Sequence, residues 1–574
     1  MKLKTFLFLS LVTFLFGCSK DNEPETQTGG IEVIVLIKND NEPIFDVIVS
    51  ISSISKEELT DIEGTVFFRN IEVGSYEISI TDPFRNIPIK QIVDVENNKT
   101  TKVVIFVDGP NVVTPSVLDI DKWVDASFSS LVANNIFGAN GYASIWGEIG
   151  SDILTASTSN SLLRKLDNYE FSPNDKIIED IWANHYKVIR NANIGIEAIE
   201  NSDFISELNS NVNEVEAQFK FLRSLVYFNL VKLFGNPVLV TSTDISQLNN
   251  PAIQDRLKVY ELIEEDLIFA ENNLEDSNIK GKASKSAAQA LLGKVYLQMA
   301  GFPLLQNDKY AKALNLFAKL DGKYTLETDY KNNFEIEKGS TNNEIIFTID
   351  FNIFGDSNNW KWFNWGPLDV SEKDFYLLTT NFIESYFKSL NDLASPITFP
   401  LSTKDSRFFE NIAPFKIQNG VTSNAQNIDD WRPYKFSENY QNGGMFHLPY
   451  LRYSDVLLMI AEAENAINGP TVKAYEAINL VRRRAFGNTD NDLSAGLDQE
   501  EFLDAILNER RLELCYEGHR KDDLIRTQKL QSVIDAYNIN HPQNTKKYQS
   551  HKYIFPIPQS EILLNSGIIQ NLDY

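Results

Sequence analysis

The sequence is poor in cysteine and has no concentrated block of positive charge. Two cysteines among 574 residues cannot form a disulfide framework. Phosphate binding needs a concentrated positive face, and the formal net charge is −26, so nucleic acid is not expected as a partner. The chain also lacks an H-E-x-x-H zinc motif, a P-loop, a nucleophile elbow and a dinucleotide fingerprint. These absences favour a binding protein over an enzyme, and we expect no cofactor and no metal site of these kinds; the 79 acidic residues leave a glycosidase with paired carboxylates as an alternative.

The composition is that of a folded chain with more than one unit. Hydrophobic residues make up 43% of the chain and aromatic residues 11%, which is typical of folded proteins and not of disordered ones. At 574 residues the chain exceeds the size of one ordinary hydrophobic core. We therefore expect two or more folded units.

The first residues are typical of an exported protein. A basic start, residues 1–4, precedes an apolar run, residues 6–16, that is too short to be a stable membrane anchor. The sequence Leu-Phe-Gly-Cys that ends at Cys18 resembles a bacterial lipobox, which implies a signal peptide of residues 1–17 and lipid attachment to Cys18. The alternative is a plain signal peptide with an incidental cysteine. Residues 18–30 are polar and predict a tether, whose acidic start resembles the surface-export signals of Bacteroidetes lipoproteins.

Short apolar runs separated by turn signals follow the tether as far as residue 108. Residues 76–80 alternate between apolar and polar side chains, which is typical of a half-buried strand. The expected strands are residues 31–37, 47–51, 64–68, 76–80, 87–95 and 102–107. They fit a small antiparallel β-sandwich over residues 31–108. Residues 60–67 and 74–78 resemble the carboxypeptidase-regulatory-like (transthyretin-like) sandwich, and this resemblance is consistent with a spacer or docking role.

Helical patterning dominates after a breaker-rich linker at residues 109–116. Residues 181–193 and 216–228 are apolar on most sides and therefore predict buried helices. Gly235 and Pro237 are expected to stop the second of these helices.

Two pairs of segments match a helical repeat. Residues 292–296 fit the L-G-x-x-Y half of a tetratricopeptide repeat and residues 313–317 fit its A-x-x-x-F half, where small residues let paired helices approach closely. Residues 451–463 and 474–484 predict another such pair. Stacked pairs would bury a continuous helical core within residues 117–574.

Residues 508–526 combine charges of both signs with the helical spacing of apolar residues. The apolar positions that share a helix face with Arg510 are Leu503, Ile506, Leu507 and Leu514. A buried guanidinium without carboxylate partners is very costly, and the nearest carboxylates are those of Glu509, Glu513 and Glu517. We therefore predict an internal ion network that fixes how two helices meet.

The same segment resembles a known family signature. Gly518 can end the helix, and Asp522 or Asp523 can cap a following turn. The run E-R-R-x-E-L-x-x-E-G-H-R-x-x-D-L-I-R resembles the signature of the SusD/RagB family of outer-membrane nutrient-binding lipoproteins. Residues 553–562 and 570–574 are similar to the family's P-I-P-x-x-E-I motif and to its closing Q-N-P-G-Y, and they follow in the family's order.

The resemblance implies both a fold and a function. The fold would be mainly α, with tetratricopeptide-type helix pairs and irregular loop excursions, preceded by the small all-β sandwich. The protein would be a lipoprotein of the cell outer membrane that faces the exterior and binds an oligomeric nutrient, most often a glycan. It would deliver this ligand as the lid of a SusC-like TonB-dependent transporter. The alternatives are a peptide-binding RagB-type receptor, a surface hydrolase and a helical scaffold that binds only protein.

A tryptophan-rich segment, residues 350–367, is the first candidate for the ligand site. It holds three of the chain's seven tryptophans, whose flat rings can stack on a sugar while a nearby amide bonds its hydroxyls. The candidate residues are Trp360, Trp362, Asn364 and Trp365. The alternative is that the rings pack this loop onto the core. A second candidate set consists of Tyr142 and Trp146.

Two acidic segments have a structural and a chemical interpretation. Glu513, Glu517 and His519 could serve in catalysis or metal binding instead of an ion network. Residues 490–494 could hold calcium, but they lack the glycine and the distal glutamate of a full calcium loop. A solvated connection between helices is the alternative there.

Overall fold

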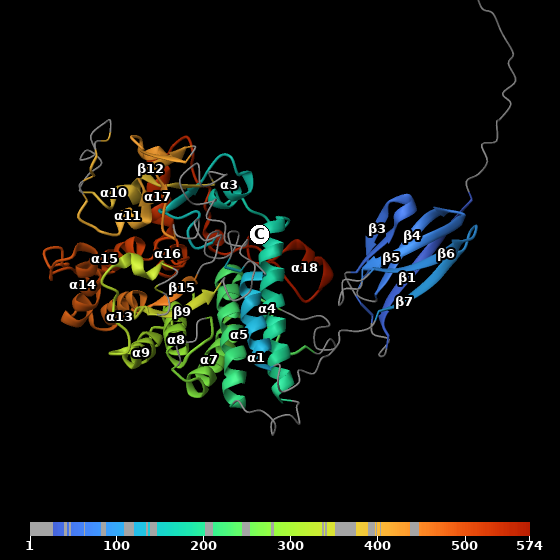
Figure 1. The fold of residues 1–574 in the computed structure, drawn as a ribbon, viewed down its shortest axis with the longest axis horizontal. Helices are drawn as coiled ribbons and strands as arrows, with labels where there is room; N and C mark the ends of the chain where they lie inside the picture. The colour runs from blue at the N-terminus through green and yellow to red at the C-terminus, as the bar shows by residue number, and fades with distance from the viewer. Residues whose placement is uncertain are drawn as a thin grey trace, which may run out of the picture. The chain divides into compact units, whose positions relative to one another are not determined.

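The computed structural model describes residues 27–38, 43–44, 47–61, 64–81, 88–107, 120–133, 136–137, 146–200, 211–243, 253–276, 281–335, 338, 341–350, 375–387, 397, 399–401, 403–418, 420–436 and 447–574. The chain divides into two compact units, Met1–Pro115 and Ser116–Tyr574 (Figure 1). None of the helices in the described ranges combines the length and the apolar character needed to cross a membrane.

The first unit is a β-sandwich, as predicted. One sheet has the strand order β4-β1-β7 and the other has the order β3-β2-β5-β6. The strands are β1 (Thr28–Ile37), β2 (Ile48–Ile51), β3 (Lys56–Leu59), β4 (Thr65–Glu72), β5 (Gly74–Thr81), β6 (Pro88–Val95) and β7 (Thr100–Val107). Alternate side chains of both sheets form one buried core, which includes Val33, Val49, Ile78 and Ile105.

Two features of the sandwich differ from the prediction. β3 is absent from the predicted strands, because its sequence, Lys-Glu-Glu-Leu, has no apolar alternation and all of it is exposed. β1 pairs with β7 in parallel, so the sandwich is not wholly antiparallel. Alternation identifies a strand but carries no information about the direction of its neighbour, which explains the second error.

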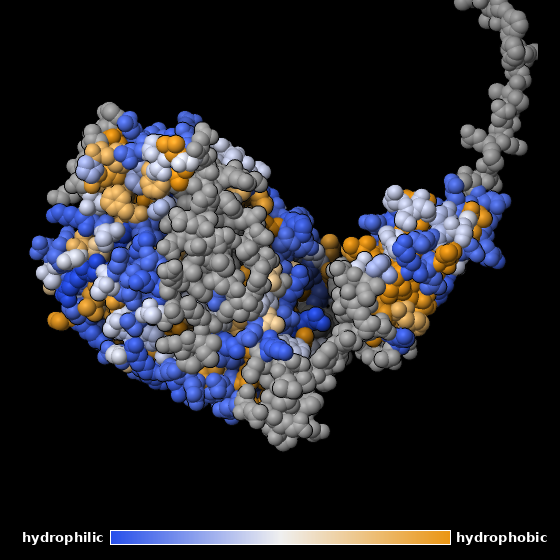
Figure 2. Space-filling view, viewed as in Figure 1, coloured by the Kyte–Doolittle hydropathy of each residue, from blue (hydrophilic) through white to orange (hydrophobic). Residues whose placement is uncertain are grey.

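The outer face of the sheet β4-β1-β7 is partly apolar, and it also carries the ion pair of Glu32 and Lys102. Phe67 is 49% exposed, Val104 37% and Phe106 47%, and Ile34 of β1 lies beside Val104. Figure 2 shows apolar side chains on the surface of this unit. Several large apolar side chains exposed on one face of a sheet can mark a surface that contacts another molecule.

The second unit is mainly α-helical, as predicted. Its longer helices are α1 (Ile120–Ala133), α4 (Lys176–Glu200), α5 (Val212–Phe234), α7 (Arg256–Asn273), α8 (Lys285–Ala300), α9 (Lys309–Phe317), α13 (Tyr453–Asn468), α14 (Val472–Phe486), α15 (Gln499–Glu513) and α17 (Leu530–Asn540). The short helices are α3 (Ser161–Asp167), α10 (Thr380–Glu384), α11 (Phe408–Asn411), α16 (Arg520–Arg526) and α18 (Gln559–Leu564). The described strands of this unit form only two-stranded sheets, β8 (Leu154–Ala156) with β10 (Tyr376–Leu378), β9 (Ile345–Asp350) with β15 (His447–Arg452), β11 (Ile412–Ala413) with β14 (Arg432–Pro433), and β12 (Phe415–Gln418) with β13 (Val421–Asn424).

Helices that follow one another in the chain pack together in this unit. Contacts join α4 to α5, α7 to α8, α8 to α9 and α13 to α14 (Figure 1). Gly293 of α8 shows how closely they approach, because a Cβ atom at this position would lie 2.3 Å from Cε1 of Phe317 in α9. The predicted helix pairs are therefore confirmed, together with the reason for a small residue between them.

The C-terminus is fixed against the end of α5. This helix ends at Phe234, and Gly235, with a φ of 77°, follows it as predicted. Asn571 Nδ2 donates hydrogen bonds to the backbone oxygens of Phe234 at 2.8 Å and Phe555 at 2.9 Å. The last motif of the sequence thus holds the chain end against a buried helix.

Candidate functional site

The charged segment that the sequence singles out forms α15, a turn and α16. Asp498 begins α15 with a capping box, in which its side chain accepts hydrogen bonds from the backbone N–H groups of Glu500 and Glu501. α15 ends at Glu513, and Gly518, with a φ of 86°, lies in the turn before α16. The acidic, basic and histidine side chains of α15 and the turn that are buried are Glu509, Arg510, Arg511, Glu513, Glu517 and His519.

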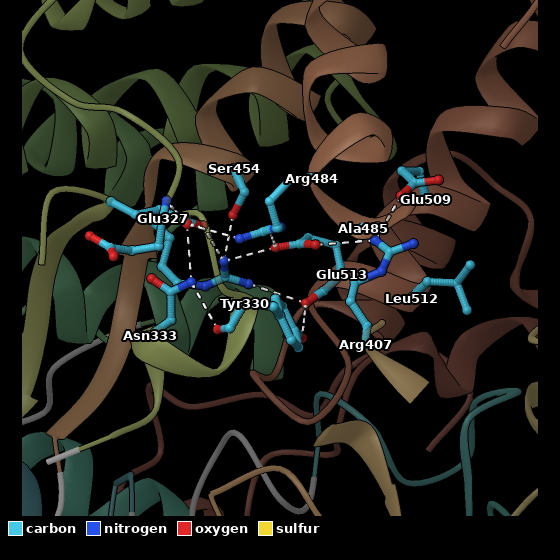
Figure 3. A network of polar contacts seen from close by, with 12 residues as sticks. Glu327, Tyr330, Asn333, Arg407, Ser454, Arg484, Ala485, Glu509, Leu512 and Glu513 are labelled. Carbon is cyan, nitrogen blue, oxygen red and sulfur yellow. Dashed lines mark hydrogen bonds and ion pairs between the residues drawn. The ribbon is translucent and has the colours of Figure 1, made fainter. Parts of the chain in front are cut away.

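Glu513 lies at the centre of a network of buried ion pairs (Figure 3). Its carboxylate accepts hydrogen bonds from Arg484 at 2.5 Å, from Arg452 at 2.9 Å and from Arg407 at 3.1 Å. Burial alone would raise the pKa of this carboxyl, but the three arginines outweigh burial and hold the pKa well below its ordinary value. Glu513 is therefore ionised and fully partnered, as the predicted internal ion network requires.

Arg510 lies on the core side of α15, as predicted, but its predicted partners are wrong. Its guanidinium donates hydrogen bonds to Asp455 at 2.6 Å and to Asp523 at 2.7 Å. The three carboxylates predicted to pair with Arg510 bind other cations instead. They are those of Glu509, Glu513 and Glu517. Glu509 directly precedes Arg510 and therefore points about 100° away from it. Glu517 lies beyond the end of α15, and the carboxylate of Glu513 binds Arg407, Arg452 and Arg484 instead.

The contacts of Glu517 and His519 favour the structural interpretation over catalysis or metal binding. Glu517 accepts hydrogen bonds from Lys435 at 2.7 Å and Arg452 at 2.8 Å. His519 is 5% exposed, and burial lowers its pKa well below the ordinary value. In the described part of the chain, no group of three or more His, Cys, Asp or Glu residues could hold a metal ion.

The acidic residues of α16 do not cap it, contrary to the prediction. Asp522 and Asp523 lie inside its first turn. Asp522 accepts hydrogen bonds from Nζ of Lys232 at 2.7 Å and from Nε1 of Trp146 at 3.2 Å. Asp523 binds Arg510, so both carboxylates tie α16 to neighbouring elements instead of closing its end.

Trp146 is a core residue. It is 1% exposed, its ring centroid lies 4.4 Å from that of Phe555, and Nζ of Lys521 lies 4.3 Å from its ring centroid. Neither ring face is open to a sugar, so the structure does not match the ligand-binding role predicted for Trp146. The other predicted site residues lie outside the described residues: Cys18, Tyr142, Trp360, Trp362, Asn364 and Trp365.

The acidic segment at residues 490–494 is a connection between α14 and α15. Asp492 accepts hydrogen bonds from Arg483 at both carboxylate oxygens, at 3.0 Å for Oδ1 and 2.6 Å for Oδ2. Because this ion pair occupies the carboxylate that a cation would need, the geometry favours the helix connection over a calcium loop.

An open groove beside α3 is a candidate site that no sequence signal marks. Its volume is about 560 Å³, and it is broadly open to solvent, so a ligand there would be covered on one side only. The groove is lined by Thr158, Ser161, Arg164, Lys165 and Glu170. These are common surface residue types without motif spacing, so sequence reasoning misses them. Their hydroxyl, guanidinium, ammonium and carboxylate groups can together bind a polar ligand through hydrogen bonds.

Two family models match the chain. One is described as "SusD family" and matches residues 343–574. The other is described as "Starch-binding associating with outer membrane" and matches residues 110–297. The charged segment, its arginine partners and the C-terminal motifs lie in the first match, and the groove beside α3 lies in the second.

Relatives and solved structures agree with these models. SusD-like protein P25 of Formosa agariphila is 25% identical over 503 residues, which cover 81% of this chain and 93% of that protein. The crystal structure of a SusD homolog from Bacteroides thetaiotaomicron superposes with a TM-score of 0.67 at 26% identity and covers 81% of this chain and 98% of its own. A laminarin-binding SusD-like protein has the same fold, with a TM-score of 0.58 at 22% identity over 80% of this chain and 99% of its own.

Proposed function

Because the chain belongs to the SusD family, we propose that it is a receptor that captures oligosaccharides and does not cleave them. The similarity of the helical unit to SusD-like structures, one of which binds laminarin, carries this proposal. The paired state of Glu513 and Glu517, the two glutamates considered above for catalysis, supports it. Arginines hold Glu513, and Lys435 holds Glu517, so neither group is free for acid–base chemistry.

We propose the tryptophan-rich segment as the main contact with the glycan. In sequence it lies between β9, which ends at Asp350, and β10, which begins at Tyr376. Loops that join elements of a rigid scaffold are frequent binding sites, and tryptophan rings stack on the C–H face of a sugar. Trp360, Trp362 and Trp365 would supply the rings, and Asn364 and Tyr142 would bond hydroxyls.

The proposed location is the cell outer membrane, with the protein facing the exterior. Lipid on Cys18 would anchor the chain, and the helical unit would cover a SusC-like TonB-dependent transporter as its lid. The β-sandwich would serve as a spacer or docking unit. Its exposed Phe67, Val104 and Phe106 support a docking role, because exposed apolar side chains of this size are costly unless another surface covers them.

A calorimetric panel of neutral glycans, acidic glycans and peptides tests this function. The protein would be the chain from Ser19 onward, which keeps every described element and lacks the lipid site. Saturable binding of a glycan is the expected result. Saturable binding of peptides alone would instead identify a RagB-type receptor, and steady release of shortened glycan would identify a hydrolase.

Matched aromatic variants then locate the site. Ala at Trp360, Trp362 or Trp365 removes the stacking surface, whereas Phe keeps part of it, so affinity should fall in the order Trp, Phe, Ala. Affinity that is unchanged in all three Ala variants would exclude the tryptophan-rich segment as the binding site. Mass spectrometry of the full chain and its Cys18→Ala variant tests the lipid anchor.

A further inference from the structure

The groove beside α3 has a fixed floor of polar side chains. Ser161, Arg164 and Lys165 are three and four residues apart on one short helix, so they share a face. Thr158 precedes this helix and Glu170 follows it, and all five side chains line the volume of about 560 Å³. The groove is therefore an open site lined by two hydroxyl groups and three charged groups.

Arg164 is the group in this groove whose charge is least compensated. Its Nη1 donates a hydrogen bond to the backbone oxygen of Ala156 at 3.1 Å, and its Nη2 donates to Oδ1 of Asn544. Both acceptors are neutral. A guanidinium carries five N–H donors, so these two bonds orient Arg164 and leave donors and a full positive charge for a ligand.

The surroundings of the groove are positive although the chain is strongly acidic. The contacts around α3 involve five cationic side chains and three carboxylates. Three of the cations form ion pairs with these carboxylates, whereas Arg164 and Lys552 bond only neutral oxygens. The cations are Arg164, Lys165, Lys546, Lys547 and Lys552, and the carboxylates are Asp167, Glu170 and Asp175. This local excess of positive charge lies in a chain with a net charge of −26, and it would attract an anion to a surface that otherwise repels it.

We infer that this groove binds the anionic group of an acidic oligosaccharide, a carboxylate or a sulfate ester, on the guanidinium of Arg164. The planar fork of arginine matches two oxygens of such a group with two parallel hydrogen bonds. The hydroxyls of Thr158 and Ser161 and the carboxylate of Glu170 bond the hydroxyls of the sugar ring. The inference rests on the proposed function, since it names the class of glycan that the receptor takes.

The test compares one acidic and one neutral probe on the chain from Ser19 onward. Tetragalacturonate carries carboxylates, maltotetraose has none, and a sulfated maltotetraose separates sulfate from carboxylate recognition. Arg164→Gln should weaken binding of at least one anionic probe about tenfold to a hundredfold, as expected for loss of a charge-assisted pair. Raising the ionic strength should weaken the same binding. The affinity for maltotetraose should change in neither case.

Two further variants control for folding and for charge alone. Ser161→Trp fills the groove from an exposed position and keeps Arg164 and its contacts, so it should reduce anionic binding as well. Lys258→Gln removes one positive charge from the exposed surface of α7, where the side chain is 62% exposed. It should leave binding of every probe unchanged, because Lys258 does not line the groove and its ammonium is paired with Glu261.

The outcomes separate this inference from the proposed function. If Arg164→Gln and Ser161→Trp lose binding of an anionic probe and Lys258→Gln keeps it, the result supports both the receptor function and the acidic-glycan inference. Binding of maltotetraose without binding of either anionic probe overturns the acidic-glycan inference and keeps the receptor function. Anionic binding that is insensitive to Arg164→Gln and Ser161→Trp overturns the groove as its site. Absence of binding by every glycan overturns both.

Discussion

Replacing Arg484 by Met should destabilise the helical unit far more than the same replacement at its neighbour Arg483. Both arginines belong to α14 and each binds two carboxylates, but their side chains are 4% and 32% exposed. Inside the protein, Arg484 binds Glu513 at 2.5 Å (Figure 3). It also binds Glu344 at 3.1 Å. Methionine keeps the apolar stem, so the substitution removes mainly the charge and its hydrogen bonds.

The expected cost follows from burial. Removing one partner of a buried ion pair costs about 3–5 kcal/mol, because the remaining charge is poorly solvated. Glu344 and Glu513 are 0% exposed, and Arg452 stays as a partner of both. The loss of unfolding free energy in Arg484→Met should therefore lie near the lower end of this range, at about 3 kcal/mol. The ion pairs of Arg483 are at the surface and are worth about 1 kcal/mol or less.

Urea unfolding followed by far-ultraviolet circular dichroism measures this difference, since the helical signal comes from the helical unit. Arg484→Met should lose about 2 kcal/mol more unfolding free energy than Arg483→Met. Equal losses in the two variants would refute the claim that burial makes this network stabilising.

The same variant should become more sensitive to acid. The arginines hold the pKa of Glu513 below its ordinary value, so this group contributes stability above the ordinary pKa and loses it as the pH falls through the folded-state pKa. Removing Arg484 raises that folded-state pKa. Acid unfolding of Arg484→Met should therefore begin at a higher pH than that of the native chain, and an unchanged acid transition would contradict this.

Three further variants test other parts of the fold. Burial raises the pKa of Glu148 to about 8. Between the ordinary pKa of a glutamate and about pH 8, the folded state therefore holds a proton on Glu148 that the unfolded state lacks. The unfolding free energy consequently falls as the pH rises through this range. Glu148→Gln should flatten that fall by about 1.4 kcal/mol per pH unit, measured by urea unfolding at several pH values. Gly293→Ala should cost about 1–3 kcal/mol because the new Cβ meets Phe317, and adding Phe317→Leu should recover part of it. Asn571→Ala should lower the melting temperature through the loss of two buried hydrogen bonds, about 1–3 kcal/mol.

The helical core could be predicted from the sequence because its signals are local. Residues 181–193 and 216–228 carry apolar side chains around most of their helices, and burial in α4 and α5 follows directly. Because glycine has no side chain, Gly235 indicates the end of a helix and Gly293 indicates a close contact between two helices. The core position of Arg510 also follows from helical spacing alone.

The partners of these residues could not be predicted, because they come from distant segments. Asp455 lies 55 positions before Arg510, and Asp522 lies 376 positions after Trp146. The sequence around Trp146 does not distinguish a tryptophan that faces solvent from one that bonds a buried aspartate. The groove at Arg164 has no sequence signal at all, since only the fold brings Asn544 beside it.

The central claim is that this protein binds glycans and leaves them intact. One calorimetric titration of the chain from Ser19 onward against the glycan panel, followed by chromatography of each glycan after the titration, tests it directly. We predict saturable binding of at least one oligosaccharide, recovered at its original length. Binding to no glycan on the panel, or recovery of shortened products, would contradict the claim.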